Sequence, residues 1–411
     1  MSPAWNLERA EDHLLSLELF GMKFGLERMR RLLTVLDSPQ RSFRAIHVVG
    51  TNGKSSTVRM AAAILQAHSI ETGAYLSPHL SSFTERVRVA DADLAPSAFA
   101  ASVQRAASAA AKVDRTLSGG ERVTQFELLT AAAFSALAEA GVEVAVIEAG
   151  LGGRHDATNV LDAPVVALTN VGLEHTRWLG PTVTDIAREK LAVVRRGATL
   201  VTGELHPEAE AELAGVQAGR VLRTTPEDAG TVALPAFQRA NFAVARVAAD
   251  ALAGPLDVAA VERVAAEIAV PGRFQVVSER PLTIFDGAHN PGGMTALAVA
   301  LSDTLGERRL VAVLSVLDDK DASGMLGALL PLCAQVVFTA SRNPRALSPA
   351  TLSSLAGQLG GPAAEVEPDP ERAVARAREL AGPGGAVVAT GSIYLIADLL
   401  SDPGRRVASA L

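Results

Sequence analysis

The sequence predicts an α/β protein with a doubly wound, mostly parallel sheet, followed by a second α/β domain. Two observations carry this prediction. Apolar, strand-like runs alternate with helix-like runs, and parallel strands need such crossover helices between them. In addition, the run VEVAVI at 142–147 is almost continuously apolar, as expected of a strand buried on both faces of a parallel sheet.

The first elements form a strand, loop and helix unit. Residues 25–36 alternate charged and apolar side chains at helical spacing and stop before the helix-breaking Ser-Pro pair at 38–39. A strand at 45–49, a glycine-containing loop and a helix at 55–66 follow. The alanine-rich stretch 100–113 is predicted to be a surface helix.

The remaining elements of the first domain continue the alternation. A helix is predicted at 124–140, where Thr124 and Glu127 have the spacing of a capping box, and it leads into the VEVAVI strand. Another strand ends near residue 170. The run 182–197 then indicates a helix that its final glycine closes.

The second domain repeats this pattern after the Pro and Gly residues of VPGRF, 270–274. Its predicted strands lie in the runs LTIF, LVAVLSV, AQVVFTA and GAVVAT, with helical stretches between them. We therefore expect domains at 1–272 and 273–411.

Length and composition exclude several classes of protein. At 411 residues the chain fits two domains, because single cores stop growing near about 250–300 residues. A net charge of -7 argues against a general nucleic-acid binder. The N-terminus lacks a signal-peptide pattern and no run of about 18 apolar residues occurs, so we expect a cytoplasmic protein without a membrane span. The single cysteine, Cys333, is predicted to be a small core residue.

The loop GTNGKSS, 50–56, is a candidate phosphate site. Its small residues allow successive backbone N–H groups to face a phosphate, and the following helix directs its positive end to the same place. Lys54 would neutralise phosphate oxygens, and Ser55 or Ser56 could offer a hydroxyl to Mg²⁺. The alternative is a tight turn between a strand and a helix. The strand, loop and helix context favours nucleotide binding.

A metal bound to ATP needs further oxygen ligands. Glu148 is the best candidate, because it ends the buried VEVAVI strand at the edge of the sheet where ligands bind in such folds. The alternative is a loop-capping role, although a carboxylate at this depth is costly unless it is paired. Ser77 and His175 also follow apolar segments, and alone each fits a structural turn residue equally well. A GTPase would need a guanine-specifying Asn-Lys-x-Asp segment after a strand, and none occurs. The spacing of the phosphate-loop residues does not by itself exclude a kinase.

Beyond these local signals, the chain resembles the folylpolyglutamate synthases and bifunctional dihydrofolate synthases of the Mur ligase superfamily. The matching segments occur in the family's order and span nearly the whole chain: GTNGKSST (50–57), YLSPHLSSFTERVRV (75–89), IEAGLGGRHDATNV (147–160), GLEHTRWLG (172–180), IAREKLAV (186–193), PGRFQ (271–275), FDGAHNPGG (285–293), LDDKD (317–321) and TGSIYLIADLL (390–400). The resemblance implies an ATPase domain and a smaller, Rossmann-like C-terminal glutamate-ligase domain that closes over it.

The resemblance also implies the ATP and metal residues. Magnesium, as two ions, would be held through Ser77, Glu148 and His175. ATP would be bound by Gly50, Thr51, Asn52, Gly53, Lys54, Ser55, Ser56, Asn241, Arg273 and Asp286. Lys190 matches a lysine that the family carbamylates near the second metal, and without the resemblance it would be interpreted as a solvated helix lysine. Two departures are Ser55, where the family usually has glycine, and Glu174, where it usually has aspartate.

On the pterin or folate side, the resemblance implies three short segments. They are Gly21, Met22, Lys23 and Phe24; Thr124, Gln125, Phe126 and Glu127; and Arg154, His155, Asp156 and Ala157. In the second segment, a capping box already explains the presence of Thr124 and Glu127, so only the resemblance implies that they contact the pterin. His289 would help to position glutamate or the closing domain, with a satisfied loop histidine as the alternative.

The expected reaction needs no protein nucleophile. A pterin or folate carboxylate attacks the γ-phosphate of ATP while Lys54 and magnesium spread the developing charge, and glutamate then attacks the acyl phosphate to form an amide. The small-molecule substrates are thus dihydropteroate or folate, L-glutamate and ATP, and the family's habit implies a monomer. The alternatives are a Mur-type ligase acting on a UDP-linked cell-wall precursor and a non-catalytic nucleotide sensor.

Overall fold

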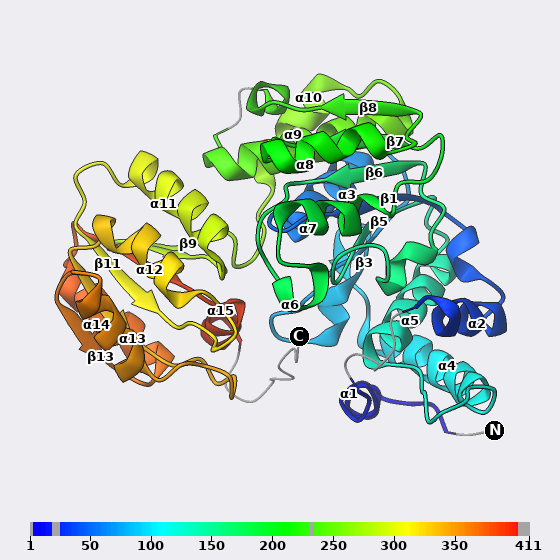
Figure 1. The fold of residues 1–411 in the computed structure, drawn as a ribbon, viewed down its shortest axis with the longest axis horizontal. Helices are drawn as coiled ribbons and strands as arrows, with labels where there is room; N and C mark the ends of the chain where they lie inside the picture. Colours follow the sequence, from blue (N-terminus) through cyan, green and yellow to red (C-terminus); the bar gives the residue numbers. More distant parts are fainter. Residues whose placement is uncertain (1–2, 19–24, 231–232, 402–411) are drawn as a thin grey trace. The chain divides into compact units, whose positions relative to one another are not determined.

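The computed structural model describes residues 3–18, 25–230 and 233–401, which form two compact units (Figure 1). The first unit comprises the chain up to Ala233 together with Arg239–Ile268, and the second comprises Leu234–Gln238 and the chain from Ala269 onward. The predicted pterin-side residues Gly21, Met22, Lys23 and Phe24 lie outside the described residues.

An eight-stranded sheet forms the centre of the first unit, in the order β4-β3-β2-β5-β1-β6-β7-β8. Its strands are β1 (Arg44–Val49), β2 (Thr72–Tyr75), β3 (Val87–Val89), β4 (Ala92–Asp93), β5 (Val144–Glu148), β6 (Val165–Leu168), β7 (Thr199–Thr202) and β8 (Arg220–Arg223). All neighbours pair in parallel except β3, which is antiparallel to both β2 and β4. The predicted fold class is confirmed.

Helices cover this sheet on both faces (Figure 1). They are α1 (Leu7–Leu15), α2 (Glu27–Val35), α3 (Lys54–Ala67), α4 (Pro96–Asp114), α5 (Gln125–Glu139), α6 (Thr176–Leu179), α7 (Val183–Leu191), α8 (Pro207–Glu212), α9 (Ala236–Ala253) and α10 (Val258–Glu267). Helix α4, predicted as a surface helix, buries one face that includes Phe99 and Val103 and packs against α1, α2 and α5. The capping box at the start of α5 is confirmed.

One helix boundary is a correction. Helix α7 was expected to continue to Gly197, but it ends at Leu191, and Gly197 instead adopts a positive φ of 86° before β7. After the C-cap residue Ala192 come two β-branched residues, Val193 and Val194, and such residues disfavour continuation of a helix. Val193 packs into the apolar core between the sheet and α7, together with Leu168, Ile186 and Leu200. Burial in this core therefore decides where the chain leaves the helix.

The second unit has its own six-stranded sheet, in the order β13-β12-β11-β14-β10-β9. Its strands are β9 (Gln275–Glu279), β10 (Leu282–Phe285), β11 (Leu310–Leu314), β12 (Gln335–Phe338), β13 (Ala364–Val366) and β14 (Ala386–Thr390). Its helices are α11 (Pro291–Leu305), α12 (Ala322–Leu329), α13 (Pro349–Gln358), α14 (Pro370–Ala381) and α15 (Ile393–Leu400). Only β9 is antiparallel among the described strands of this sheet. Cys333 is buried in its core, as predicted.

Six short 3₁₀ helices complete the described structure: Pro39–Arg41, Phe83–Arg86, Ala157–Val160, Leu213–Gly215, Pro226–Ala229 and Leu330–Leu332. Across the described residues, no helix combines the length and the apolar character that crossing a bilayer requires.

Candidate functional site

The loop GTNG lies between β1 and α3, where β1 ends at Val49 and α3 begins at Lys54. Two of its positions require glycine. Gly50 has a φ of 152°, and a Cβ there would lie 1.9 Å from the Oγ1 atom of Thr169. Gly53 has a φ of 82°, and a Cβ there would lie 2.1 Å from the Oδ1 atom of Asn241. Backbone conformation and close contact both exclude a side chain, so the loop has a defined shape.

The segment after β6 holds this loop from the opposite side. The Oγ1 atom of Thr169 donates a hydrogen bond to the carbonyl oxygen of Asn52 over 2.6 Å, and the backbone N–H of Asn52 donates to the Oδ1 atom of Asn170 over 3.0 Å. The backbone N–H of Gly172 also donates to the Oγ1 atom of Thr51. Sequence reasoning did not single out Thr169 or Asn170. The available signal was two polar residues directly after the apolar strand VVAL.

Two lysines converge on one backbone oxygen of the loop. Lys190, on α7, donates from Nζ to the carbonyl oxygen of Gly50 over 2.7 Å, and Lys54 donates to the same oxygen over 3.1 Å. Lys190 is only 4% exposed, so its interpretation as a solvated helix lysine is wrong. Burial, reinforced by the nearby charge of Lys54, lowers the pKa of Lys190 to about 7, whereas Glu174 and Asp156 act in the opposite direction.

Glu148 joins the phosphate loop to the segment after β2. Its Oε1 atom accepts a hydrogen bond from the Oγ atom of Ser55 over 3.0 Å, and its Oε2 atom accepts one from the backbone N–H of Ser77 over 3.1 Å. Strands β1, β2 and β5 are parallel neighbours, so their carboxyl ends bring these three residues to one edge of the sheet. Ser55, and not the almost fully buried Ser56, therefore presents the hydroxyl that contacts this carboxylate.

His175, the third predicted metal ligand, is the N-cap residue of α6 and has a φ of 50°. Its side chain is exposed, and its Nε2 atom lies 3.8 Å from an Oε1 atom of Glu174. Within the described ranges, no three His, Cys, Asp or Glu side chains are grouped as a metal site. The predicted set of one serine, one glutamate and one histidine stays a prediction.

The loop after β5 packs against the helix that carries Lys190. A Cβ on Gly153 would lie 2.6 Å from the carbonyl oxygen of Glu189, and the backbone N–H of Arg154 donates to that oxygen over 2.9 Å. Arg154 and His155 are exposed, and Ala157 is buried.

Asp156 organises this loop from within. Its carboxylate accepts hydrogen bonds from the backbone N–H groups of Leu151 and Thr158 over 2.7 and 3.0 Å, and burial raises its pKa. Among the four predicted pterin-side residues of this loop, Arg154 and His155 are therefore the two that face solvent.

The predicted pterin-side residues Thr124, Gln125, Phe126 and Glu127, at the start of α5, are all buried. The backbone N–H of Thr124 donates to Glu127, whose carboxylate also pairs with Arg28 over 3.1 Å. Gln125 donates from Nε2 to the carbonyl oxygen of Leu14. The ring of Phe126 lies so close to Gly150 that a Cβ there would be 2.3 Å from it. The structure thus brings this segment against the loop after β5, and its contact with a pterin stays a prediction.

In the second unit, Asp286 joins two of the sequence motifs. Its carboxylate accepts hydrogen bonds from the backbone N–H groups of Phe274 and Ala288 over 2.7 and 2.8 Å. Burial raises the pKa of Asp286, and the charge of Arg273 opposes that shift. Arg273 lies against Gly287, where a Cβ would be 2.3 Å from its guanidinium. The Nδ1 atom of His289 is 2.9 Å from the carbonyl oxygen of Gly287, which fixes the ring orientation.

Comparison with known protein families identifies the class. Residues 48–276 match the Mur ligase middle domain, and residues 272–393 match the Mur ligase, glutamate ligase domain. A chain that carries this pair of domains is an ADP-forming ligase of the Mur type.

Individual relatives narrow the class. A dihydrofolate synthase/folylpolyglutamate synthase of Mycobacterium tuberculosis is 36% identical over 82% of this chain and 78% of its own length. A probable bifunctional folylpolyglutamate synthase/dihydropteroate synthase of Haloferax volcanii is 36% identical over 95% of this chain, which spans 49% of that relative's length. The chain belongs to the folylpolyglutamate synthase/dihydrofolate synthase family.

Solved structures agree with this assignment. A folylpolyglutamate synthase of Mycobacterium tuberculosis complexed with ADP aligns with a TM-score of 0.88 and 32% identity, covering 96% of this chain and 97% of the other. Escherichia coli FolC in complex with DHPP and ADP aligns with a TM-score of 0.86 and 30% identity, covering 97% of each chain. A bifunctional folylpolyglutamate synthase/dihydrofolate synthase with Mn, AMPPNP and L-glutamate bound aligns with a TM-score of 0.85 and 30% identity, covering 97% of this chain and 99% of that one.

Proposed function

We propose that this chain uses ATP to join L-glutamate to dihydropteroate, to reduced folates, or to both, through an acyl-phosphate intermediate. The observation that carries the proposal is the meeting of Ser55, Ser77 and Glu148 at one edge of the sheet, directly beside the phosphate loop. The relatives support it, because the similar solved enzymes hold ADP, DHPP, and Mn with AMPPNP and L-glutamate.

The donor atoms present fit a magnesium ion that is bound to ATP. A hydroxyl and a carboxylate are the hard oxygen ligands that magnesium prefers, and phosphate oxygens and water would supply the rest. Ser55, Ser77, Glu148 and His175 would hold the metal. When bound, the metal supplies charge neutralisation for the transferred phosphoryl group.

The protein residues contribute position and charge. The backbone N–H groups of residues 50–56 would hold the phosphates, and Asn241 lies against Gly53 where the nucleotide would enter. Lys54 would shift from the carbonyl oxygens of its own loop to the phosphoryl oxygens as the acceptor carboxylate attacks. Phosphate then leaves the acyl carbon when the amine of glutamate attacks it, and a proton passes from that amine to solvent.

Lys190 would act as a carbamate. A pKa near 7 leaves much of its amine neutral at physiological pH, and the neutral amine attacks CO₂, so that Nζ gains a carboxylate and releases one proton to solvent. The product is an anion beside the phosphate loop. It would replace a buried positive charge with a group that can face the second metal ion.

The second unit would supply the glutamate-ligase part, with the division between domains at 272/273. Arg273 and Asp286 would complete the ATP site, and His289 would help to position glutamate. On the pterin side, the exposed Arg154 and His155 and the segment from Thr124 to Glu127 would contact the substrate. We propose a cytoplasmic monomer.

The test measures ADP release with each substrate omitted in turn. We expect ADP and phosphate release to require glutamate together with dihydropteroate or tetrahydrofolate, and comparison of the two acceptors assigns one or both synthase activities. Equal ADP release without a pterin would disprove the proposal. Thermal protection by UDP-linked muropeptides, with none by pterins, would establish a cell-wall substrate instead.

A further inference from the structure

Helix α1 precedes the stretch that matches the Mur ligase domains, yet it carries a buried acid. Glu11 is 8% exposed, whereas Glu8 and Asp12 on the same helix are exposed. A carboxylate is costly to bury unless hydrogen bonds compensate for lost water. The partners of Glu11 therefore indicate what the helix holds.

Those partners lie in the loop between β2 and β3. The Oγ atom of Ser82 donates to the Oε1 atom of Glu11 over 3.2 Å, and the backbone N–H of Phe83 also donates to this carboxylate. Burial nevertheless raises the pKa of Glu11 above its ordinary value. Helix α1 is thus attached to the loop by a side-chain and a backbone hydrogen bond.

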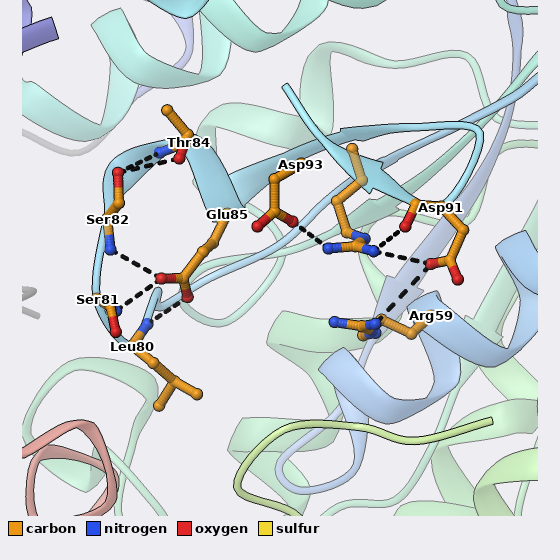
Figure 2. Close-up of polar contacts among 9 residues, drawn as sticks. Arg59, Leu80, Ser81, Ser82, Thr84, Glu85, Asp91 and Asp93 are labelled. Atoms are coloured by element: carbon orange, nitrogen blue, oxygen red, sulfur yellow. Dashed lines mark hydrogen bonds and ion pairs between the residues drawn. The ribbon is translucent and has the colours of Figure 1, made fainter. Parts of the chain in front are cut away.

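A second carboxylate organises the same loop from within (Figure 2). Glu85 accepts hydrogen bonds from the backbone N–H groups of Leu80, Ser81 and Ser82 over 2.8, 2.7 and 2.8 Å. The loop is closed at its base, where the backbone N–H of Leu76 donates to the carbonyl oxygen of Arg86. Residues 76–86, hereafter the 76–86 loop, consequently form one connected unit that includes Ser77.

The other end of α1 reaches the start of α5. The carbonyl oxygen of Leu14 accepts from the Nε2 atom of Gln125 over 2.7 Å, and the carbonyl oxygen of Glu18 accepts from the backbone N–H of Gln125 over 2.8 Å. The N-terminal segment therefore connects the 76–86 loop with the helix start assigned to the pterin side. Ser77 in turn donates its backbone N–H to Glu148.

We propose that Glu11 is a positioning residue whose carboxylate holds Ser82 and Phe83, and through the 76–86 loop keeps Ser77 beside Glu148 for metal binding. The inference rests on the proposed metal role of Ser77. It assigns to the N-terminal helix a part in the metal site, although α1 supplies no ligand of its own.

The test uses full-length protein and two readouts that require neither pterin nor glutamate. Hydrogen–deuterium exchange follows peptides that cover residues 80–86, and calorimetry compares AMPPNP binding with and without Mg²⁺. Glu11→Ala should raise exchange in these peptides and weaken the magnesium-dependent part of binding about tenfold, with metal-free binding unchanged. Glu11→Gln keeps one acceptor oxygen and should lose less.

The matched control is Asp12→Asn, which removes the same charge one residue away on the exposed face and should change neither readout. Should Glu11→Ala fail to fold, Ser82→Ala removes the same hydrogen bond from the loop side. Unchanged exchange would overturn the proposal, as would faster exchange with unchanged magnesium dependence. Because no acceptor substrate enters either measurement, these outcomes are separate from failure of the proposed reaction.

Discussion

Lys190 and Gly50, 140 positions apart in the sequence, are joined by a 2.7 Å hydrogen bond from the lysine Nζ atom to the glycine carbonyl oxygen. Lys54 donates to the same oxygen. Two ammonium groups at one acceptor repel each other, and burial disfavours charge on the deeper one. Burial and the charge of Lys54 therefore lower the pKa of Lys190, and helix α7 places its amine beside the phosphate loop.

The lowered pKa of the Lys190 amine should make the free energy of unfolding depend on pH. The pKa of Lys190 is about 7 in the folded chain, whereas an ordinary lysine, as in the unfolded chain, has a pKa of 10.5. Between these two pH values the unfolded chain binds more protons than the folded chain, so the free energy of unfolding rises with pH. Below pH 7 the cost of burying a charged amine is fully present. In CO₂-free buffer, Lys190→Met should raise Tm over wild type most at pH 6 and least at pH 10.

The control for this measurement is Lys112→Met, which replaces an exposed lysine on α4 and should show no such trend. A Tm difference for Lys190→Met that stays constant from pH 6 to pH 10 would contradict the assigned pKa.

Catalysis should depend on the same residue. Lys190→Ala removes the group proposed to become a carbamate, and we expect the rate of ADP release to fall about 100-fold while ADP affinity by calorimetry stays near that of wild type. Added short-chain carboxylates should restore part of the rate by occupying the vacated space. An unchanged rate would remove Lys190 from the mechanism.

The hydroxyl groups of Ser55 and Ser56, at the start of α3, should have different roles. Ser55 contacts Glu148, so Ser55→Ala should raise the Mg²⁺ concentration for half-maximal rate about tenfold, and Ser55→Thr should retain most activity. Ser56 is 1% exposed and its hydroxyl is not the one that contacts Glu148, so Ser56→Ala should leave the Mg²⁺ concentration for half-maximal rate unchanged. A magnesium titration in which Ser56→Ala, and not Ser55→Ala, raises this concentration would show that the assignment is wrong.

Gly53 should tolerate no side chain. A Cβ there would meet Asn241 at 2.1 Å, so Gly53→Ala should reduce ADP affinity about tenfold and destabilise the fold by more than ~1 kcal/mol. Gly120→Ala is the control, since Gly120 has a similar φ of 78° with nothing within 4 Å, and it isolates the backbone strain. Calorimetry and thermal unfolding measure both effects. Equal losses in the two variants would rule out a specific role for the Asn241 contact.

Local patterns determined much of this protein from the sequence alone. Strand and helix alternation predicted the sheet, the Thr124 and Glu127 spacing predicted a capping box that is present, and the position of Glu148 after an apolar strand placed it at the carboxyl edge. These features depend on residues that are close in the chain, so their spacing is sufficient to identify them.

Tertiary structure alone decided the remaining points. Without the family resemblance, local sequence patterns favoured a solvated Lys190, left Ser55 and Ser56 equivalent and extended α7 to Gly197. The structure buries Lys190, turns Ser55 to Glu148 and ends α7 at Leu191. Burial and the partner of a polar group depend on segments far apart in sequence, as with Lys190 and Gly50 or Glu11 and Ser82. Only packing brings such segments together, and packing sets the charge and direction of these side chains.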